Sequence, residues 1–308
     1  MTKCIIGIDG GGTKTDAIIG NVTGDIMGHG HSGPCNIAAM SPEDALRSVT
    51  DAIANALVDA ETTPDNIAGI CACVAGYSAF PKRLALMEEL GRLFPAARID
   101  VEADYAAALT GGTGGKPGLV VIAGTGSVAY GENAYGQAAR AGAYGYLIDD
   151  SGSGYGVGRE AIAAVLRQYD GTGPETRLTP VLHSVVGISS PLDLISEVYG
   201  GKLDRVAIAS LAETVSREAA EGDEVARKIL HRTGGALAVL AEAAARTLFP
   251  DTAFPIITVG SLWQAGPALT DVFARSVTRF APKASISPPI LGPVEGALFR
   301  AVQHLSSS

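Results

Sequence analysis

Short apolar runs rich in valine and isoleucine alternate along the chain with longer segments in which apolar residues recur every three or four positions. The short runs are typical of buried strands and the longer segments of amphipathic helices. The predicted strands span residues 4–9, 15–20, 67–75, 99–101, 119–123 and 255–259. Because strands come early and helices crowd the second half, the pattern predicts a mixed α/β fold.

The clearest predicted helix follows Ser41, a favourable N-cap, and has a proline and two acidic residues in its first turn. Leu46, Val49, Ile53 and Leu57 then form one apolar stripe at helical spacing. The other predicted helices span residues 81–94, 158–169, 174–186, 191–199, 205–221, 223–249 and 294–305.

One pattern occurs twice. Residues 5–21 (IIGIDGGGTKTDAIIGN) and 119–133 (LVVIAGTGSVAYGEN) each read as an apolar strand, a glycine-rich turn ending in a hydroxyl residue, and a second strand. Thr13 and Ser127 are the two hydroxyl residues. This internal repeat predicts two related lobes, each opening with a glycine-tipped hairpin.

A glycine turn at the end of a strand can direct several backbone N–H groups at one anion, because no Cβ blocks the approach. Two such turns suit a polyphosphate. The first turn is not a P-loop, because Thr13 follows Gly12 where that motif requires lysine. Gly124, Gly126 and Ala129 match a dinucleotide-binding pattern, but a turn follows them where that fold requires a helix.

The charge balance narrows the class of partner. The 308 residues include 23 Lys and Arg against 32 Asp and Glu, a formal net charge of −9, which argues against nucleic-acid binding. No apolar stretch reaches the length of a membrane span, and the N-terminal run is too short for a signal peptide. We therefore expect a cytoplasmic protein with four reduced cysteines and no membrane partner.

Six segments, in this order, resemble the N-acetylglucosamine kinases, which belong to the BadF/BadG-type ATPases within the sugar kinase and actin superfamily. The segments are DGGGTKTD (9–16), the loop at Asn36, VEADYAAA (101–108), IAGTGS (122–127), AYGYLIDDSGSGYGVGREA (143–161) and ITVGSLW (257–263). The resemblance implies two ribonuclease H-like (actin-like ATPase) lobes around a central cleft. It divides the chain into residues 1–110 plus 292–308 and residues 111–291.

The resemblance also implies the roles of individual residues. Asp104 matches the catalytic aspartate, and Asp9 is placed to hold Mg²⁺. The residues expected to bind ATP are Gly11, Gly12, Thr13, Lys14, Gly124, Thr125, Gly126, Ser127, Gly260 and Ser261. The residues expected to bind the sugar are Asn36, Asp104, Tyr144, Gly145 and Asp150.

The implied reaction is transfer of phosphate from ATP to the 6-hydroxyl group of N-acetylglucosamine or a related amino sugar, by a homodimer. The chain departs from the pattern beside the expected sugar pocket. Tyr144 stands where relatives usually carry tryptophan, and residues 149–153 read DDSGS in place of GDEGS. Glucosamine kinase is therefore an alternative, and an ATPase that activates another enzyme is a further one, although it would require cysteine ligands for an iron–sulfur cluster.

Structural alternatives stand beside several of these roles. Asp104 is also typical of a helix N-cap, and Asp9 of an aspartate that caps its own turn. His29 and His31 alternate onto one strand face but lack a third metal ligand nearby in the sequence. Trp263 suits either stacking on adenine or packing in the core.

Overall fold

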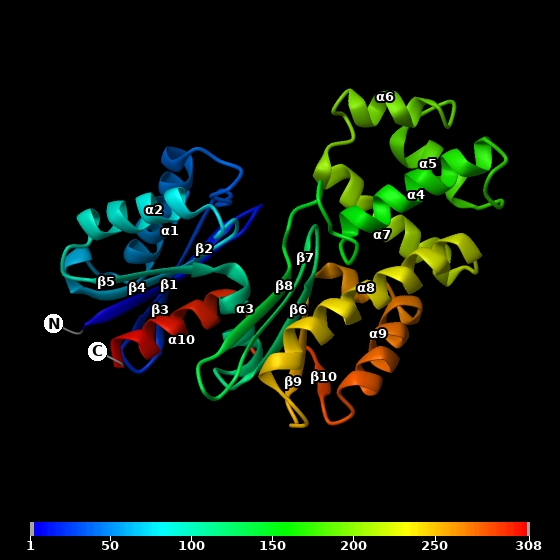
Figure 1. Cartoon of the computed structure of the whole chain (residues 1–308). Helices are drawn as coiled ribbons and strands as arrows, with labels where there is room; N and C mark the ends of the chain where they lie inside the picture. Colours follow the sequence, from blue (N-terminus) through cyan, green and yellow to red (C-terminus); the bar gives the residue numbers. More distant parts are fainter. Residues whose placement is uncertain (1–2, 307–308) are drawn as a thin grey trace. The chain divides into compact units, whose positions relative to one another are not determined.

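The computed structural model describes residues 3–306 of the chain, which forms two compact units (Figure 1). The first unit is Met1–Pro117 with Pro288–Ser308, and the second is Gly118–Ser287. The expected boundary between residues 110 and 111 falls inside helix α3 (Asp104–Thr113). The returning segment joins the first unit before residue 292, because Ile290 and Leu291 donate their N–H groups to carbonyl groups at the end of α3.

The first unit is built on a five-stranded sheet in the order β3-β2-β1-β4-β5. Its strands are β1 (Cys4–Gly10), β2 (Thr15–Asn21), β3 (Ile26–Ser32), β4 (Ile67–Val74) and β5 (Arg98–Ala103). The first three are antiparallel neighbours, whereas β4 runs parallel to both β1 and β5. The β1–β2 pair is the first predicted glycine-tipped hairpin.

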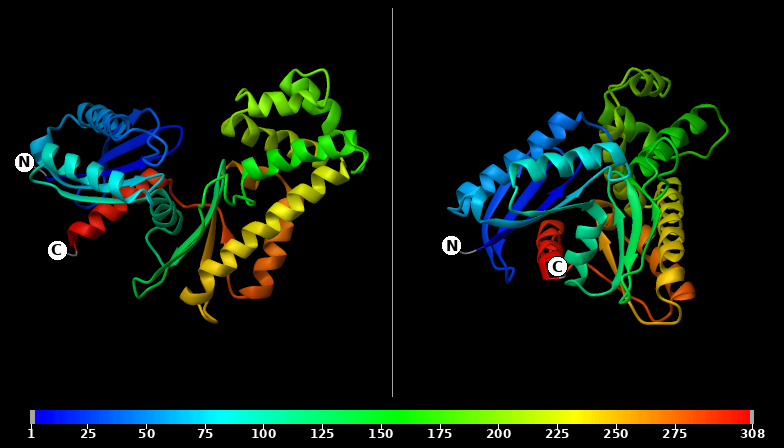
Figure 2. Two further views of the ribbon diagram at one scale, coloured as in Figure 1. Left: turned by 45° about the horizontal axis from the view of Figure 1, so that its top comes forward. Right: turned by 60° about the vertical axis from the view of Figure 1, so that its left-hand side comes forward.

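Helices cover both faces of this sheet. Alternate residues of β1 explain why: Ile6 and Ile8 pack with α1 (Pro42–Asp59) and α2 (Phe80–Leu93), whereas Ile5 packs with α3 and α10 (Pro293–Ser306). A Cβ on Gly7 would lie 2.2 Å from the backbone nitrogen of Leu298, so α10 rests directly on β1. Figure 2 shows α3 and α10 side by side on the second face. A short 3₁₀ turn at Pro64–Asn66 leads into β4.

The second unit repeats the same sheet topology. Its order is β10-β9-β6-β7-β8, in which β6, β7 and β8 are antiparallel neighbours and β9 is parallel to β6 and β10. The strands are β6 (Gly118–Ala123), β7 (Ser127–Glu132), β8 (Ala138–Gly142), β9 (Pro255–Val259) and β10 (Ser285–Ser287). Strands one to five of each unit thus correspond in order, which confirms the predicted repeat and its second hairpin.

The helices of the second unit surround one continuous core. They are α4 (Gly154–Tyr169), α5 (Leu178–Val186), α6 (Asp193–Tyr199), α7 (Arg205–Ala220), α8 (Glu224–Leu248) and α9 (Pro267–Phe280), with a 3₁₀ turn at Ser261–Gln264. Helix α9 was not predicted from the sequence, although Leu269, Phe273 and Val277 supply its buried stripe. No helix among residues 3–306 has the length and apolar character needed to cross a membrane.

Helix α4 begins before the expected residue 158. Ser153 is its N-cap, because the hydroxyl oxygen of Ser153 accepts the N–H of Gly156 at 3.0 Å. The glycines in its first turns allow close packing: a Cβ on Gly158 would lie 1.9 Å from the carbonyl oxygen of Ile208 in α7. The glycine-rich segment before residue 158 is therefore a tightly packed helix start.

Candidate functional site

The first glycine turn connects β1 to β2. The Gly11 N–H donates to the Lys14 carbonyl at 2.9 Å, and the Gly11 carbonyl accepts from Cys35 at 2.8 Å, so the turn is fixed from both sides. A Cβ on Gly12 would meet no atom within 4 Å. The fold itself thus leaves free the space above Gly12, as a turn that binds an external group requires.

Lys14 does not extend freely from this turn. Its Nζ lies 2.6 Å from Asp16, which His31 Nδ1 contacts at 2.6 Å from the other side. Burial acts to raise the pKa of Asp16, but the hydrogen bonds from Lys14 and His31 outweigh it and hold that pKa below its ordinary value. His31 therefore serves this carboxylate, and no metal cluster among the described residues includes it.

Asp9 lies one residue before the end of β1. Burial, together with the negative charges of Asp104 and Asp16, raises the pKa of Asp9 to about 7. A desolvated carboxyl group beside other carboxylates is a position that a divalent cation would stabilise. Asp9 and its surroundings therefore fit the Mg²⁺ that the family implies.

Asp104 is the first residue of α3, and the N-cap position belongs to Ala103. One oxygen of Asp104 accepts the N–H of Tyr105 at 3.0 Å. Burial raises the pKa of Asp104 above its ordinary value, although this backbone hydrogen bond opposes the shift. Asp104 is therefore not the N-cap of α3. It is a desolvated carboxyl group in the first turn of the helix.

Asn36 is held beside the end of β4 by a bridge to Ala75. Its side-chain oxygen accepts the N–H of Ala38 at 3.1 Å. A Cβ on Gly76, which has a φ of +78°, would lie 2.5 Å from this oxygen. Gly76, which the sequence analysis did not single out, therefore makes room for the Asn36 side chain.

The second glycine turn connects β6 to β7. The Gly124 N–H donates to the Gly126 carbonyl at 2.9 Å, and the Gly124 carbonyl accepts from Gly154 at the start of α4 at 2.7 Å. A Cβ on Gly124, like one on Gly12, would meet nothing within 4 Å. Both turns thus present open space above a glycine.

Asp150 supports this second turn. Its Oδ1 accepts both the Ser127 N–H at 2.7 Å and the Ser127 hydroxyl at 2.8 Å. Burial raises the pKa of Asp150, while the Ser127 hydrogen bonds and the charge of Arg205 oppose the shift. The sequence analysis placed Asp150 with the sugar; in this structure one of its oxygens is occupied by the backbone and hydroxyl of Ser127.

Tyr144 and Gly145 lie in the loop after β8. The Tyr144 side chain is exposed, and the Arg140 guanidinium lies 5.3 Å from its ring centre. Gly145 has a φ of +89°, which favours glycine. Ala143, just before them, donates its N–H to the Ser127 carbonyl at 3.0 Å, so this loop is connected to the second turn.

A polar pocket of about 450 Å³ adjoins the second turn within the second unit. It brings together Gly124 and Thr125 of the turn with Ser261, which follows β9. A Cβ on Gly260 would lie 2.3 Å from the Ala123 carbonyl oxygen, so only glycine lets this segment approach the turn. The remaining lining residues are Gly154, Val206, Ala209, Ser210, Ala212, Glu213, Ser216, Leu262, Gln264 and Ala265.

The pocket does not include Trp263. The Trp263 Nε1–H donates to the Val121 carbonyl at 3.1 Å. The Trp263 ring packs edge-on against the Phe273 ring, with 4.7 Å between the ring centres. The structure therefore favours core packing over adenine stacking. Helix α7 lines one wall of the pocket, which the sequence analysis missed because nothing in its amphipathic pattern marks Ser210 and Glu213.

Arg205, the first residue of α7, is a second residue that the sequence analysis missed. A Cβ on Gly126 would lie 3.3 Å from both Arg205 Nη2 and Asp150 Oδ2, so the guanidinium reaches the second turn. It lies 5.3 Å from the Tyr146 ring centre. Its Nε is buried and has no hydrogen-bond partner among the described residues. A partly buried guanidinium whose Nε has no hydrogen bond, beside a glycine turn, suits an anion.

Comparisons with known proteins agree with these features. The family model described as "BadF/BadG/BcrA/BcrD ATPase family" matches residues 6–301. The N-acetylmuramic acid/N-acetylglucosamine kinase of Clostridium acetobutylicum is 30% identical, over 92% of this chain and 93% of that protein. The N-acetyl-D-glucosamine kinase of Dictyostelium discoideum is 29% identical, over 98% and 99%.

A crystal structure shares the fold. A proposed N-acetylglucosamine kinase from Chromobacterium violaceum superposes with a TM-score of 0.76 at 24% identity, covering 97% of this chain and 98% of that one. The two-unit α/β architecture expected from the resemblance is therefore confirmed.

Proposed function

Since this chain belongs to the BadF/BadG/BcrA/BcrD ATPase family, we propose that it is an ATP-dependent kinase that phosphorylates the 6-hydroxyl group of N-acetylglucosamine or a related amino sugar. The observation that carries the proposal is the pocket in which Gly124 and Thr125 of the second turn meet Ser261. Such a pocket suits a nucleotide whose phosphates lie at the turn and whose adenosine lies along α7.

Phosphoryl transfer requires mainly positioning and charge neutralisation. In the second unit, Gly124 leaves room for phosphate oxygens, and the Gly126 turn lies beside the Arg205 guanidinium. In the first unit, Thr13 and the open Gly12 position provide the other phosphate-binding turn. Asp9 would hold Mg²⁺, which neutralises phosphate charge when bound.

Asp104 is the proposed general base. It accepts the proton of the sugar hydroxyl as that oxygen attacks the γ-phosphate. Asn36, Tyr144, Gly145 and Asp150 are proposed to bind the sugar. Arg140 places a positive charge beside Tyr144. This charge would repel the ammonium group of glucosamine and so favours a neutral acetamido group. Glucosamine is therefore the second candidate substrate.

The test is a coupled ADP-release assay with N-acetylglucosamine, glucosamine, N-acetylmannosamine, glucose and N-acetylmuramic acid. We expect Mg²⁺-dependent turnover that is slow until one amino sugar is added, with the 6-phosphate as product. A preference for glucosamine would select the second candidate. Rapid ATP hydrolysis that no sugar stimulates would contradict the kinase proposal and favour an ATPase activator.

Replacing Arg205 with methionine should lower kcat/KM for ATP by roughly 10- to 100-fold, because a hydrogen bond to a charged group contributes about 1.5–3 kcal/mol. Methionine retains an apolar stem beside Tyr146 but no charge. Steady-state kinetics with varied ATP would measure the change.

Arg217→Met is the matched control, because Arg217 lies on the same helix and is half exposed. Its kinetics should equal those of the unmodified protein. Equal behaviour of the two variants would remove Arg205 from the phosphate site.

A further inference from the structure

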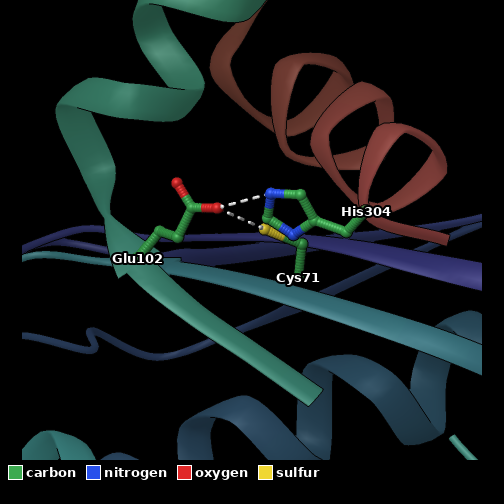
Figure 3. A group of neighbouring side chains, drawn as sticks. All are labelled: Cys71, Glu102 and His304. Carbon is green, nitrogen blue, oxygen red and sulfur yellow. Dashed lines mark hydrogen bonds and ion pairs between the residues drawn. The ribbon is translucent and has the colours of Figure 1, made fainter. Parts of the chain in front are cut away.

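Three potential metal ligands meet on one face of the first sheet, away from the glycine turn. Cys71 comes from β4, Glu102 from β5, and His304 from the last turn of α10 (Figure 3). One ligand atom of each lies within 4.8 Å of the others. Thiolate, imidazole and carboxylate are the three ligand types that zinc takes in proteins.

Two of the three separations are close to those of a tetrahedral zinc centre, and the third, between Cys71 and His304, is within 4.8 Å. Zinc–ligand bonds of about 2.0–2.3 Å place neighbouring ligand atoms about 3.3–3.7 Å apart. In the structure His304 Nε2 lies 3.1 Å from Glu102 Oε1, and Cys71 Sγ lies 3.9 Å from the same oxygen. Shifts of a few tenths of an ångström would bring these pairs to the ideal range.

Each polar ligand is also oriented by an outer partner. His304 Nδ1 lies 3.0 Å from Asp100, which leaves Nε2 directed at Glu102. Arg300 Nη2 holds the other oxygen of Glu102 at 2.6 Å, so that Oε1 alone faces the cluster. Carboxylate–histidine pairs of this kind fix the imidazole tautomer and ring orientation in zinc sites.

The cluster is also accessible from solvent. Cys71 is fully buried, whereas the side chains of Glu102 and His304 are 18% and 25% exposed. An ion can therefore enter from the Glu102 and His304 side, and a water molecule can occupy a fourth position.

We propose that Cys71, Glu102 and His304 bind a zinc ion that fastens the last turn of α10 to β4 and β5. On binding, the Cys71 thiol loses its proton to solvent, His304 binds through a neutral Nε2 while Nδ1 stays beside Asp100, and Glu102 binds as the carboxylate. The two ligand charges balance the ion, and Arg300 remains paired with the outer oxygen of Glu102.

Without a metal, an ion-pair network accounts for Asp100, Glu102 and Arg300, and the Cys71 thiol lies within hydrogen-bond distance of Glu102 Oε1 at 3.9 Å and of Cys73 Sγ at 3.7 Å. Cobalt(II) distinguishes the two cases, because it adopts tetrahedral zinc sites and gives a thiolate charge-transfer band only when sulfur is a ligand. The experiment is a cobalt titration of the full-length, chelator-treated and reduced protein, followed by competition with zinc.

We expect one equivalent of cobalt, a thiolate charge-transfer band, displacement by zinc, and a rise in Tm with zinc. Cys71→Ser should abolish the band, and His304→Gln should weaken zinc binding at least roughly tenfold, as a lost ligand or its orienting partner typically does. Asp100→Asn should weaken binding while leaving the band in place.

Cys35→Ser and His29→Gln are the matched controls, a buried cysteine and an exposed histidine elsewhere in the same unit. Both should bind cobalt normally. If Cys71→Ser fails to fold, His304→Gln and Asp100→Asn decide the question. Absence of the charge-transfer band in the unmodified protein, or equal zinc affinity in His304→Gln, would overturn the site and leave an ion-pair network.

Discussion

Asp104→Asn should lower kcat by roughly 10²- to 10⁴-fold, because asparagine keeps the shape of aspartate but cannot accept the hydroxyl proton as a general base. Sugar affinity should change much less. The N-cap of α3 is Ala103, and asparagine can still accept the Tyr105 N–H, so the helix start should remain intact. Turnover, the sugar dissociation constant and Tm would be measured on one preparation.

The raised pKa of Asp104 predicts two effects of pH. The base must be ionised, so kcat should fall as pH falls through the Asp104 pKa, which lies above its ordinary value of 3.8. The stability of the folded protein has the opposite dependence on pH. Because the folded state favours the protonated carboxyl group, ionisation destabilises it above pH 3.8, and Asp104→Asn should raise Tm at neutral pH.

Asp193→Asn provides the matched control, because Asp193 is also the first residue of a helix, α6. It should leave kcat unchanged. Near-normal turnover in a well-folded Asp104→Asn protein would remove Asp104 from catalysis.

Gly124→Ala and Gly260→Ala should have opposite consequences, although both replace a glycine beside the same pocket. In Gly124→Ala the new Cβ would enter open space, so Tm should not change. KM for ATP should rise roughly tenfold or more, because the methyl group would occupy the approach of the phosphates to the turn. The Gly260 Cβ would lie 2.3 Å from the Ala123 carbonyl oxygen at a φ of +110°. Strain and overpacking of this kind cost about 2–5 kcal/mol, which predicts a Tm about 5–15 °C lower.

Differential scanning fluorimetry and ATP kinetics on both variants would separate a glycine that the ligand requires from one that the fold requires. Gly136→Ala is a suitable control for a strained turn glycine remote from the pocket lining, since Gly136 has a φ of +73° and a Cβ there would meet nothing. A large loss of Tm in Gly124→Ala would contradict the assignment of its open space to a ligand.

The features that could be predicted from sequence are those encoded locally. The two hairpins follow from apolar runs that flank glycine turns, and α1 follows from the Ser41 cap and its stripe. The order of the six motifs along the chain was then enough to predict the two-unit α/β fold. Asp9 was singled out because it lies at the end of a strand beside the glycine turn, whereas Asp104 was singled out by the resemblance.

The features that were missed depend on contacts between distant segments. Arg205 begins an ordinary amphipathic helix, and only the fold brings its guanidinium to Gly126. Glu213 is one of two acidic residues on the same helix, and only the pocket distinguishes it from Glu218. The resemblance implies a sugar-binding role for Asp150, and its hydrogen bonds to Ser127 become apparent only when β7 and the loop after β8 are assembled.

The two sheets share one strand order, and in each half a glycine close behind the fourth strand leaves room for a neighbouring oxygen. In the first half this is Gly76, whose missing Cβ accommodates the side-chain oxygen of Asn36 at 2.5 Å. In the second half it is Gly260, whose missing Cβ accommodates the Ala123 carbonyl at 2.3 Å. Each half thus uses a glycine behind its fourth strand to admit a neighbouring oxygen, a side-chain amide in one half and a main-chain carbonyl in the other, so a Cβ at either position would push away the segment that packs there.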